Sequence, residues 1–293
     1  MTPLELWMVL LSALLHAAWN LFAKGSRDPM SFSLVLSVVP ALLLLGLLPF
    51  IDLAEVPLAV WKLLSVTGVA HGLYFLFLTL GYEKGDLSLV YPISRSAPAF
   101  VTLAAIPLLG DVVSPMGALG IAVVVLSMWL VQTEGRVRWH AFVEPGAVYA
   151  YLALLATVAF SLIDKRAMTL LSAAPWSSPV PKAVLYYFLL CAAASFIFVP
   201  NALRRLRPGA FRAVATLEGG RALVSVVVSF ASYALILEAL RSASVSYVTA
   251  TRQISVLFAV GLSMVFLHER PSRPRIIGAV GTVFGVALIA LFS

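Results

Sequence analysis

Charged side chains are scarce in this sequence: Asp, Glu, Lys and Arg make up 11% of its 293 residues, against about 25% in soluble globular domains. Apolar residues make up 61%, and the mean hydropathy is +1.01. This composition excludes a soluble domain. The apolar residues also fall in blocks of about 20, the length that crosses the hydrocarbon core of a bilayer as a helix. The sequence therefore predicts an all-α polytopic membrane protein.

Several residue types and motifs that are absent or rare argue against whole classes of function. The single cysteine, Cys191, excludes an intrachain disulfide and a multi-cysteine metal site. No glycine-rich phosphate-binding loop is present, which argues against an ATP-driven pump. Four scattered histidines, no HExxH motif and no paired carboxylates within spans argue against a membrane-embedded lipid-modifying enzyme. We therefore expect no enzymatic activity, no cofactor and no metal. The net charge of +7 resides in short loops and does not predict a nucleic-acid partner.

The apolar blocks predict ten transmembrane helices joined by short loops. Their approximate bounds are 4–22, 31–50, 61–82, 87–109, 114–132, 146–164, 183–200, 221–240, 244–267 and 275–292. Ten helices can enclose a complete pathway, so a monomer suffices and a dimer is compatible with the sequence.

Sidedness follows from the basic residues, which are enriched in cytoplasmic loops. The loops after the first, third, fifth, seventh and ninth spans hold 13 of the 20 Lys and Arg residues. The opposite face holds five: Lys62, Lys165, Arg166, Lys182 and Arg241. We therefore expect a multi-pass protein of the cell (inner) membrane, with both termini on the non-cytoplasmic side.

The chain repeats itself. "HAAWNLFAK" ends at Lys24 and the similar "TVAFSLIDK" ends at Lys165, 141 positions later, whereas "LLGDVVSPMGALG" and "FLHERPSRPRIIG" end 158 positions apart. These matches predict a first five-helix repeat at 1–135, a connecting loop at 136–145 and a second repeat at 146–293. Because five is odd, the two copies must cross the membrane in opposite directions. Inverted repeats of this kind are common in secondary transporters, with the substrate site near the midplane.

These features together resemble the ten-helix EamA-type permeases of the drug/metabolite transporter superfamily. The resemblance rests on "HAAWN" followed by Lys24, on "LSLVYPISRSAPAFVTLAAIPLLGD" and on "FLHERPSRPRIIGAVGTVFGVALI", and it covers nearly the whole chain. It implies that helices one to four and six to nine surround a central cavity, with helices five and ten packed together behind it. It also implies transport by alternating access.

Two arginines lie inside predicted spans, where a charge is costly and is usually functional. Arg95 is in the fourth span, and Arg252 is one residue from its equivalent position in the ninth. Because the two spans run in opposite directions, the arginines should lie roughly 10 Å apart along the membrane normal. Two guanidinium groups in one cavity predict an anion site. Alternatively, each arginine caps backbone carbonyls or reaches a lipid headgroup, and Glu238 is a candidate partner for Arg252.

Other polar side chains in the spans extend the candidate binding site. They are Tyr91 and Ser94 beside Arg95, Thr249 and Gln253 beside Arg252, His71 and Tyr74 in the third span, and Trp19 and Asn20 in the first. Pro92 and Pro98 should bend the fourth span. His71 and Glu238 are candidates for proton coupling, although a neutral His71 bonded to a neighbouring helix explains the residue equally well.

Two further motifs have structural interpretations. Gly281 and Gly285 have GxxxG spacing and predict a close contact of the tenth helix with the fifth. Asp111 and Glu269 follow the fourth and ninth spans, and we expect them to cap the helices that follow.

The sequence favours a secondary active transporter of a small organic anion or zwitterion. Candidate substrates are phosphorylated or phosphonate compounds, carboxylates and amino acids. The alternatives are a lipid flippase, a membrane-embedded lipid-modifying enzyme, or a subunit of a larger complex.

Overall fold

Among the residues that the computed structural model describes, ten helical segments are long and apolar enough to cross a membrane. The structure describes residues 1–84, 92–136, 142–144, 146–206, 208–266, 268 and 270–293, and no strand occurs among them. The helices are α1 (Pro3–Lys24), α2 (Pro29–Leu47), α3 (Leu58–Lys84), α5 (Ala97–Leu109), α6 (Pro115–Thr133), α7 (Ala147–Ala173), α8 (Lys182–Leu203), α9 (Ala210–Leu217), α10 (Gly219–Ala239), α11 (Val245–Thr251), α12 (Ser255–Phe266) and α13 (Arg273–Phe292), with 3₁₀ turns η1 (Leu48–Phe50), η2 (Leu53–Glu55) and η4 (Arg252–Ile254).

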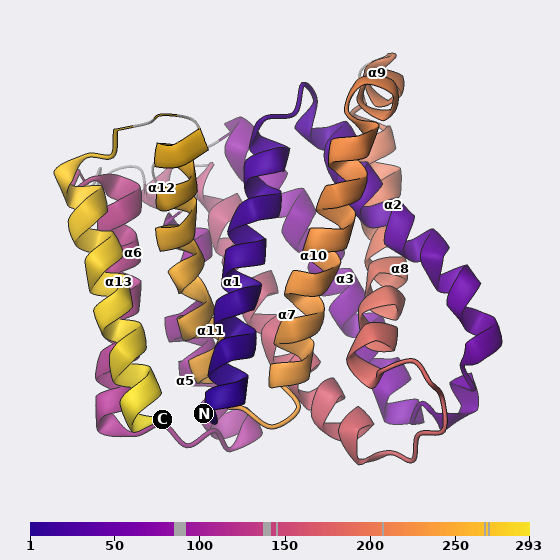
Figure 1. The fold of residues 1–293 in the computed structure, drawn as a ribbon, viewed down its shortest axis with the longest axis horizontal. Helices are drawn as coiled ribbons and strands as arrows, with labels where there is room; N and C mark the ends of the chain where they lie inside the picture. The colour runs from indigo at the N-terminus through magenta and orange to yellow at the C-terminus, as the bar shows by residue number, and fades with distance from the viewer. Residues whose placement is uncertain (85–91, 137–141, 145, 207, 267, 269) are drawn as a thin grey trace.

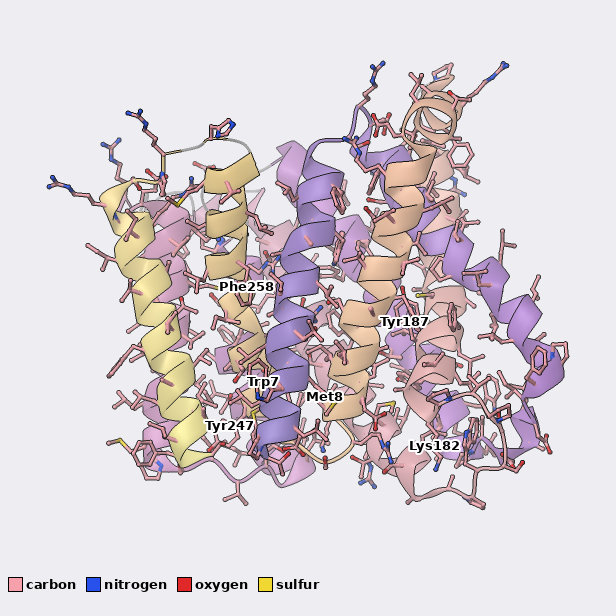
Figure 2. The ribbon with its side chains drawn as sticks, viewed as in Figure 1. Trp7, Met8, Lys182, Tyr187, Tyr247 and Phe258 are labelled. Atoms are coloured by element: carbon pink, nitrogen blue, oxygen red, sulfur yellow. The ribbon has the colours of Figure 1, made fainter. Side chains whose placement is uncertain are left out.

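The spans stand side by side, and both chain termini lie at the lower edge of the view in Figure 1. The amino terminus of Met1 donates a hydrogen bond to Ser293 Oγ at 2.7 Å. The short helix α9 lies at the opposite edge, within the arginine-rich connection between the seventh and eighth spans. Figure 2 shows nitrogen-tipped side chains gathered at that upper edge, with Lys182 at the edge of the termini.

Helices of one repeat pack against helices of the other repeat. In the first half, α1 packs on α10 and on α12, which are parts of the eighth and ninth spans. In the second half, α7 packs on α3 and on α5, which belong to the third and fourth spans. The fifth and tenth spans, α6 and α13, pack on each other. The all-α layout of five plus five spans is therefore confirmed.

The outer surface of this bundle is apolar. Trp7, Leu126 and Phe196 expose 69%, 69% and 81% of their surface. Large apolar side chains exposed over several helices suit hydrocarbon chains rather than water. Buried polar side chains, among them Asp164, Ser94 and Thr251, lie inside.

Small residues bring α6 and α13 into close contact, as the GxxxG spacing predicts. A Cβ atom added to Gly285 would lie 2.8 Å from the backbone oxygen of Gly120, and one added to Gly120 would lie 2.8 Å from that of Gly285. Gly281 faces Ser127 in the same contact. Only glycine allows two helix backbones to approach so closely.

The sixth span differs most from its predicted bounds. We expected it to end at 164, but α7 continues to Ala173. The polar run at 164–166 was interpreted as a helix end, although apolar residues follow it. Asp164 consequently lies within the helix, and its exposed fraction is 0%.

Candidate functional site

The fourth span is interrupted beside Arg95. Residues 92–95 are helical, Ser96 is in a turn, and α5 begins at Ala97. Pro98 cannot donate a backbone hydrogen bond and its ring disfavours a continuous helix. The Ser96 hydroxyl donates to Pro92 O at 2.9 Å and accepts from Trp129 Nε1 at 2.7 Å, which holds the turn in place. The bend that the prolines predict is therefore present.

The ninth span is interrupted at the equivalent place without a proline. Helix α11 ends at Thr251, the turn η4 covers Arg252–Ile254, and α12 begins at Ser255. A 3₁₀ turn in the middle of a helix often marks a functional hinge. Thus each of the two related spans is broken next to its own arginine.

Polar atoms at the η4 break lack partners. Arg252 Nε, Gln253 Oε1 and Thr251 Oγ1 are buried, and none has a hydrogen-bond partner within the described part of the chain. Buried polar atoms in proteins are nearly always paired, so three unpaired atoms at consecutive residues need an explanation. A ligand or water bound at the break would supply their partners.

The Arg252 guanidinium lies between the two halves of the bundle. Its Nη2 is 3.3 Å from Nδ1 of His16 on α1, and its Cζ lies 5.4 Å from the ring centroid of Tyr233 on α10. Arg95 is close enough to interact electrostatically with both Arg252 and His16. Within the described ranges, no ion pair joins Arg252 to a carboxylate. The site therefore concentrates positive charge.

Glu238, the candidate partner of Arg252, pairs elsewhere in the structure. Glu238 forms an ion pair with Arg241, one turn away on the exposed surface near the end of α10. At i,i+3 spacing two such side chains are neighbours on a helix, so the local partner replaces the distant one. Glu238 is also about a third exposed, and it does not contact the break.

The remaining candidates occupy different positions. Trp19 packs edge-on against His16 with ring centroids 5.3 Å apart, and Asn20 donates to the His16 carbonyl at 2.6 Å. The Thr249 hydroxyl donates to Val245 O at 2.8 Å. Trp19 therefore lies beside the arginine site, whereas Thr249 and Asn20 mainly bond to their own helices.

Three further positions complete the comparison with the prediction. Ser94 is buried beside Arg95. Tyr74 packs edge-on against Phe160 at 5.8 Å. Tyr91 lies outside the described residues.

His71 belongs to a network centred on Asp164. Its Nε2 is 3.1 Å from the Tyr233 hydroxyl, and its Nδ1 is 3.0 Å from Thr67 O. Asp164 accepts hydrogen bonds from the hydroxyls of Thr67, Tyr186 and Tyr233 at 2.7, 2.8 and 2.6 Å. Sequence reasoning missed this role of Asp164. The signal that was present is an acidic residue followed by enough apolar residues to continue the helix.

The comparison with protein families gives a match over both halves of the chain. The model of the EamA-like transporter family matches residues 3–133 and 145–291. This chain belongs to the EamA-like transporter family. The family match makes it a multi-pass membrane transporter, as the resemblance implied. No curated protein matches the sequence.

A solved structure has the same fold as this EamA-like transporter. The structure, titled "Crystal structure of protein", has a TM-score of 0.73 and covers 98% of this chain and 97% of its own. The two sequences are 15% identical, so the likeness concerns the fold alone.

Asp111 of the transporter caps a different helix from the one we expected. The helix that follows it, α6, is capped by Ser114, whose Oγ accepts from the Gly117 N–H at 3.0 Å. Asp111 instead accepts from the Ser244 hydroxyl at 2.6 Å and the Ser246 N–H at 3.1 Å, at the start of α11. Gly110 has φ +71°, and this left-handed turn ends α5 and directs the chain toward the ninth span. Glu269, the predicted counterpart, lies outside the described residues.

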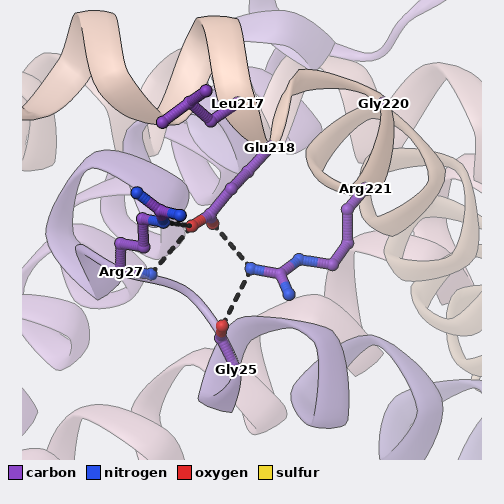
Figure 3. A pocket seen from close by; sticks show the side chains of 6 residues that line it. All are labelled: Gly25, Arg27, Leu217, Glu218, Gly220 and Arg221. Atoms are coloured by element: carbon purple, nitrogen blue, oxygen red, sulfur yellow. Dashed lines mark hydrogen bonds and ion pairs between the residues drawn. The ribbon is translucent and has the colours of Figure 1, made fainter.

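On the opposite face, Glu218 ties the first loop of the transporter to the start of α10 (Figure 3). It accepts from the Ser26 hydroxyl at 2.7 Å, the Arg27 N–H at 3.0 Å and Arg221 Nη2 at 2.7 Å. Arg221 Nη2 also donates to Gly25 O at 2.9 Å. These residues line a hollow of about 440 Å³. The Glu218 carboxylate already occupies the space between Arg27 and Arg221, so this hollow is a weaker anion site than the η4 break.

The contacts of Glu218 predict a pH effect on stability. The Arg27 N–H and the Ser26 hydroxyl bond the carboxylate and lower the pKa of Glu218 below its ordinary value of 4.5. A carboxyl whose folded-state pKa is lowered contributes stability above its unfolded pKa and loses it as pH falls through the folded value. Glu218→Gln should therefore lower the thermal midpoint at pH 7, and the difference from wild type should shrink below about pH 4.5.

Thermal unfolding of both proteins between pH 7 and pH 4 measures this difference. Glu134→Gln is the matched control, because Glu134 pairs with Arg275 on the same face with 44% of its side chain exposed. Exposed pairs contribute ~0–1 kcal/mol, so the control should change little. A constant deficit of Glu218→Gln at every pH would contradict the proposed role of the ionised carboxylate.

Proposed function

We propose that this transporter moves a small organic anion or zwitterion by alternating access, with Arg252 and Arg95 binding its acidic group. The observation that supports this proposal most is the η4 break, where the partly buried Arg252 has no carboxylate partner among the described residues and its buried Nε is unpaired. A guanidinium binds carboxylate or phosphate oxygens through its planar fork. Gln253 and Thr251 offer further polar atoms to the same ligand.

Alternating access is supported by the relation between the two breaks. The fourth and ninth spans belong to repeats of opposite direction, 1–135 and 146–293 joined by 136–145, and each is interrupted beside its arginine. In transporters built this way, interrupted helices form the midplane site and one repeat moves against the other. One chain supplies both breaks, so a monomer is the proposed working unit.

The proposal is tested first by ligand-induced stabilisation. Purified protein is heated in the presence of sulfate, succinate, methylphosphonate, glutamate, a neutral sugar and a cationic amine. Stabilisation by anions or the zwitterion, with none by the sugar or the amine, is expected. Uptake of the stabilising compound into proteoliposomes then establishes transport. Stabilisation by the amine alone would contradict an anion site.

A lipid flippase is the second candidate, and one feature favours it. An apolar groove of about 520 Å³ runs between α1, α12 and α13, and Leu14, Phe258 and Val280 are among its lining residues. A groove of this kind fits an acyl chain. Transfer of fluorescent phospholipid between leaflets of the same proteoliposomes, with no anion uptake, would favour this function.

The charge bias predicts the sidedness of the transporter. The basic loops lie at the upper edge in Figure 1, opposite both termini, and the more basic face is expected in the cytoplasm of an inner-membrane protein. Alkaline phosphatase fused after Ser293 should be active, because this enzyme requires export, and green fluorescent protein fused there should be dark. Fusions at Gly135 should give the reverse pattern. Fluorescence from the C-terminal fusion would invert the proposed orientation.

A further inference from the structure

A buried carboxylate, Asp164, lies inside the bundle and is not part of the proposed anion site. Its exposed fraction is 0%. Its three hydroxyl donors come from three other helices: Thr67 from α3, Tyr186 from α8 and Tyr233 from α10. An ionised carboxylate in a low-dielectric interior needs such donors. The network therefore accommodates a negative charge, and it brings the four helices together at one point.

The hydrogen atoms of this network can be assigned by counting donors and acceptors. The Thr67 hydroxyl donates to Asp164 Oδ1, so its oxygen offers only lone pairs to His71 Nδ1. The Thr67 carbonyl, 3.0 Å from the same nitrogen, is also an acceptor. His71 Nδ1 must therefore carry a hydrogen.

The other ring nitrogen depends on Tyr233. When Tyr233 donates to an ionised Asp164, its oxygen accepts from His71 Nε2–H, and the histidine is an imidazolium. When Asp164 is protonated on Oδ2, it donates to the Tyr233 oxygen, and the Tyr233 hydroxyl donates a hydrogen bond to the unprotonated Nε2 of a neutral histidine. Between the two arrangements the Tyr233 hydrogen moves to Oδ2 while the Nε2 hydrogen moves to Tyr233. Both contain the same number of protons.

Removing that proton leaves the network incomplete. With Asp164 ionised and His71 neutral, the single Tyr233 hydrogen faces two acceptors, Oδ2 at 2.6 Å and Nε2 at 3.1 Å. One acceptor then stays buried without a donor, which is costly. The geometry therefore favours one shared proton. The His71 side chain is 12% exposed and that of Asp164 is 0% exposed, so the proton enters at His71.

The surroundings connect this proton to the anion site. The titratable and charged groups around the network come from every neighbouring helix. They are Tyr74 on α3, Tyr186, Tyr187 and Cys191 on α8, Tyr233 on α10, Arg252 on η4, His16 on α1, Arg95 before α5, and Lys165 beside Asp164 on α7. Lys165 Nζ donates to Leu240 O at 2.9 Å. The Arg252 guanidinium lies over the ring of Tyr233, the residue that relays the proton.

We propose that Asp164 and His71 share one proton through Tyr233 and that this proton is bound together with the anion, so that the transporter is a proton–anion symporter. Without the anion, the Arg252 guanidinium repels an added positive charge in a poorly screened interior. The bound anion neutralises Arg252 and makes the proton more favourable. The effect is reciprocal, so the proton also strengthens anion binding. The coupling rests on the proposed function, whereas the shared proton does not.

The experiment measures the binding of the anion and of the proton to the same purified protein. Sulfate or succinate, which stay fully ionised near neutral pH, is added to unbuffered protein with a pH indicator. Binding is followed in parallel by thermal stabilisation. Wild type should take up protons from the solution as the anion binds. On the alkaline side of the network's titration, anion affinity should fall by up to about tenfold per pH unit, the slope for one linked proton.

The Asp164→Asn variant removes the titratable proton and keeps the hydrogen bonds that support the fold. The asparagine amide can donate to Tyr233 while its oxygen accepts from Thr67 and Tyr186, so the variant imitates the proton-loaded arrangement. It should still bind the anion, take up no proton, and lose the dependence of affinity on pH. Asp111→Asn is the matched control, because that carboxylate also accepts from hydroxyls but lies away from the network. It should take up protons as wild type does.

A second variant, Tyr233→Phe, keeps the ring beneath Arg252 and removes the hydroxyl that bonds both Asp164 and His71. Infrared difference spectra of the anion-free protein should show a pH-dependent carboxyl band that is absent in Asp164→Asn and shifted in Tyr233→Phe. Anion binding without proton uptake, or with proton release, overturns symport and leaves the proposed function intact. No stabilisation by either anion overturns the proposed function and the coupling together. Absence of both the carboxyl band of Asp164 and an imidazolium band of His71 overturns the shared proton.

Discussion

Replacing Arg252 with alanine should abolish stabilisation by anions while leaving the protein folded. Loss of one partner of a buried, hydrogen-bonded charge pair weakens binding by about 2–5 kcal/mol, or roughly 30-fold or more. Arg95→Ala should act in the same direction. Arg252→Lys should recover only part of the binding, because lysine keeps the charge and loses the planar fork. The measurement is the thermal midpoint as a function of sulfate or succinate concentration.

The unfolding temperature without anion is an independent test of the same variant. A buried charge without a carboxylate partner is costly, so Arg252→Ala should unfold at the same or a higher temperature than wild type when no anion is present. A structural arginine would give the opposite result. Arg166→Ala, an exposed arginine on α7, is the matched control and should bind anions normally. Unchanged anion binding in Arg252→Ala and Arg95→Ala would remove both from the site.

The second large effect is expected at the contact of α6 with α13. Gly285→Leu would place a Cβ 2.8 Å from both Gly120 O and Val124 Cγ2, and 3.0 Å from the Val124 backbone nitrogen. Backbone atoms cannot move aside as a flexible side chain does, so the two helices must separate. Overpacking typically costs ~1–3 kcal/mol, and a loss at the upper end is expected here. The thermal midpoint measures it.

Gly261 on α12 offers the control for this substitution. A Cβ added there has no atom within 4 Å, so a leucine would extend into open space. Gly261→Leu should leave the thermal midpoint close to wild type. Equal midpoints for the two leucine variants would show that the close approach of α6 and α13 does not stabilise the transporter.

The features predicted correctly from sequence depend on local patterns. Ten spans follow from the lengths of the apolar blocks, and the contact of α6 with α13 follows from Gly281 and Gly285 on one helix face. The bend in the fourth span follows from Pro92 and Pro98. In each case, the residues that determine the feature lie within one or two turns of each other.

The features that were missed depend on distant partners. Asp164 bonds Thr67 and Tyr233, which are 97 and 69 positions away in the chain, and its own neighbours resemble a helix end. Asp111 binds the start of α11, because Gly110 turns the chain there, and not the helix that follows it. Arg252 contacts His16, 236 positions away. No spacing rule within a single sequence identifies such pairs, although the repeat did place the two arginines in related spans.

The two interrupted spans differ in how their breaks are enforced. Pro92 and Pro98 impose the break in the fourth span by covalent geometry, so it persists in every state. The turn η4 contains no proline, and its three residues can adopt either a 3₁₀ or an α geometry. Rewinding it would rotate α12 relative to α11 by about 60° and shorten the span by ~1.5 Å, from the difference in turn and rise per residue. Rewinding the ninth span would thus change the direction of Arg252 relative to α11, whereas the bend in the fourth span stays fixed.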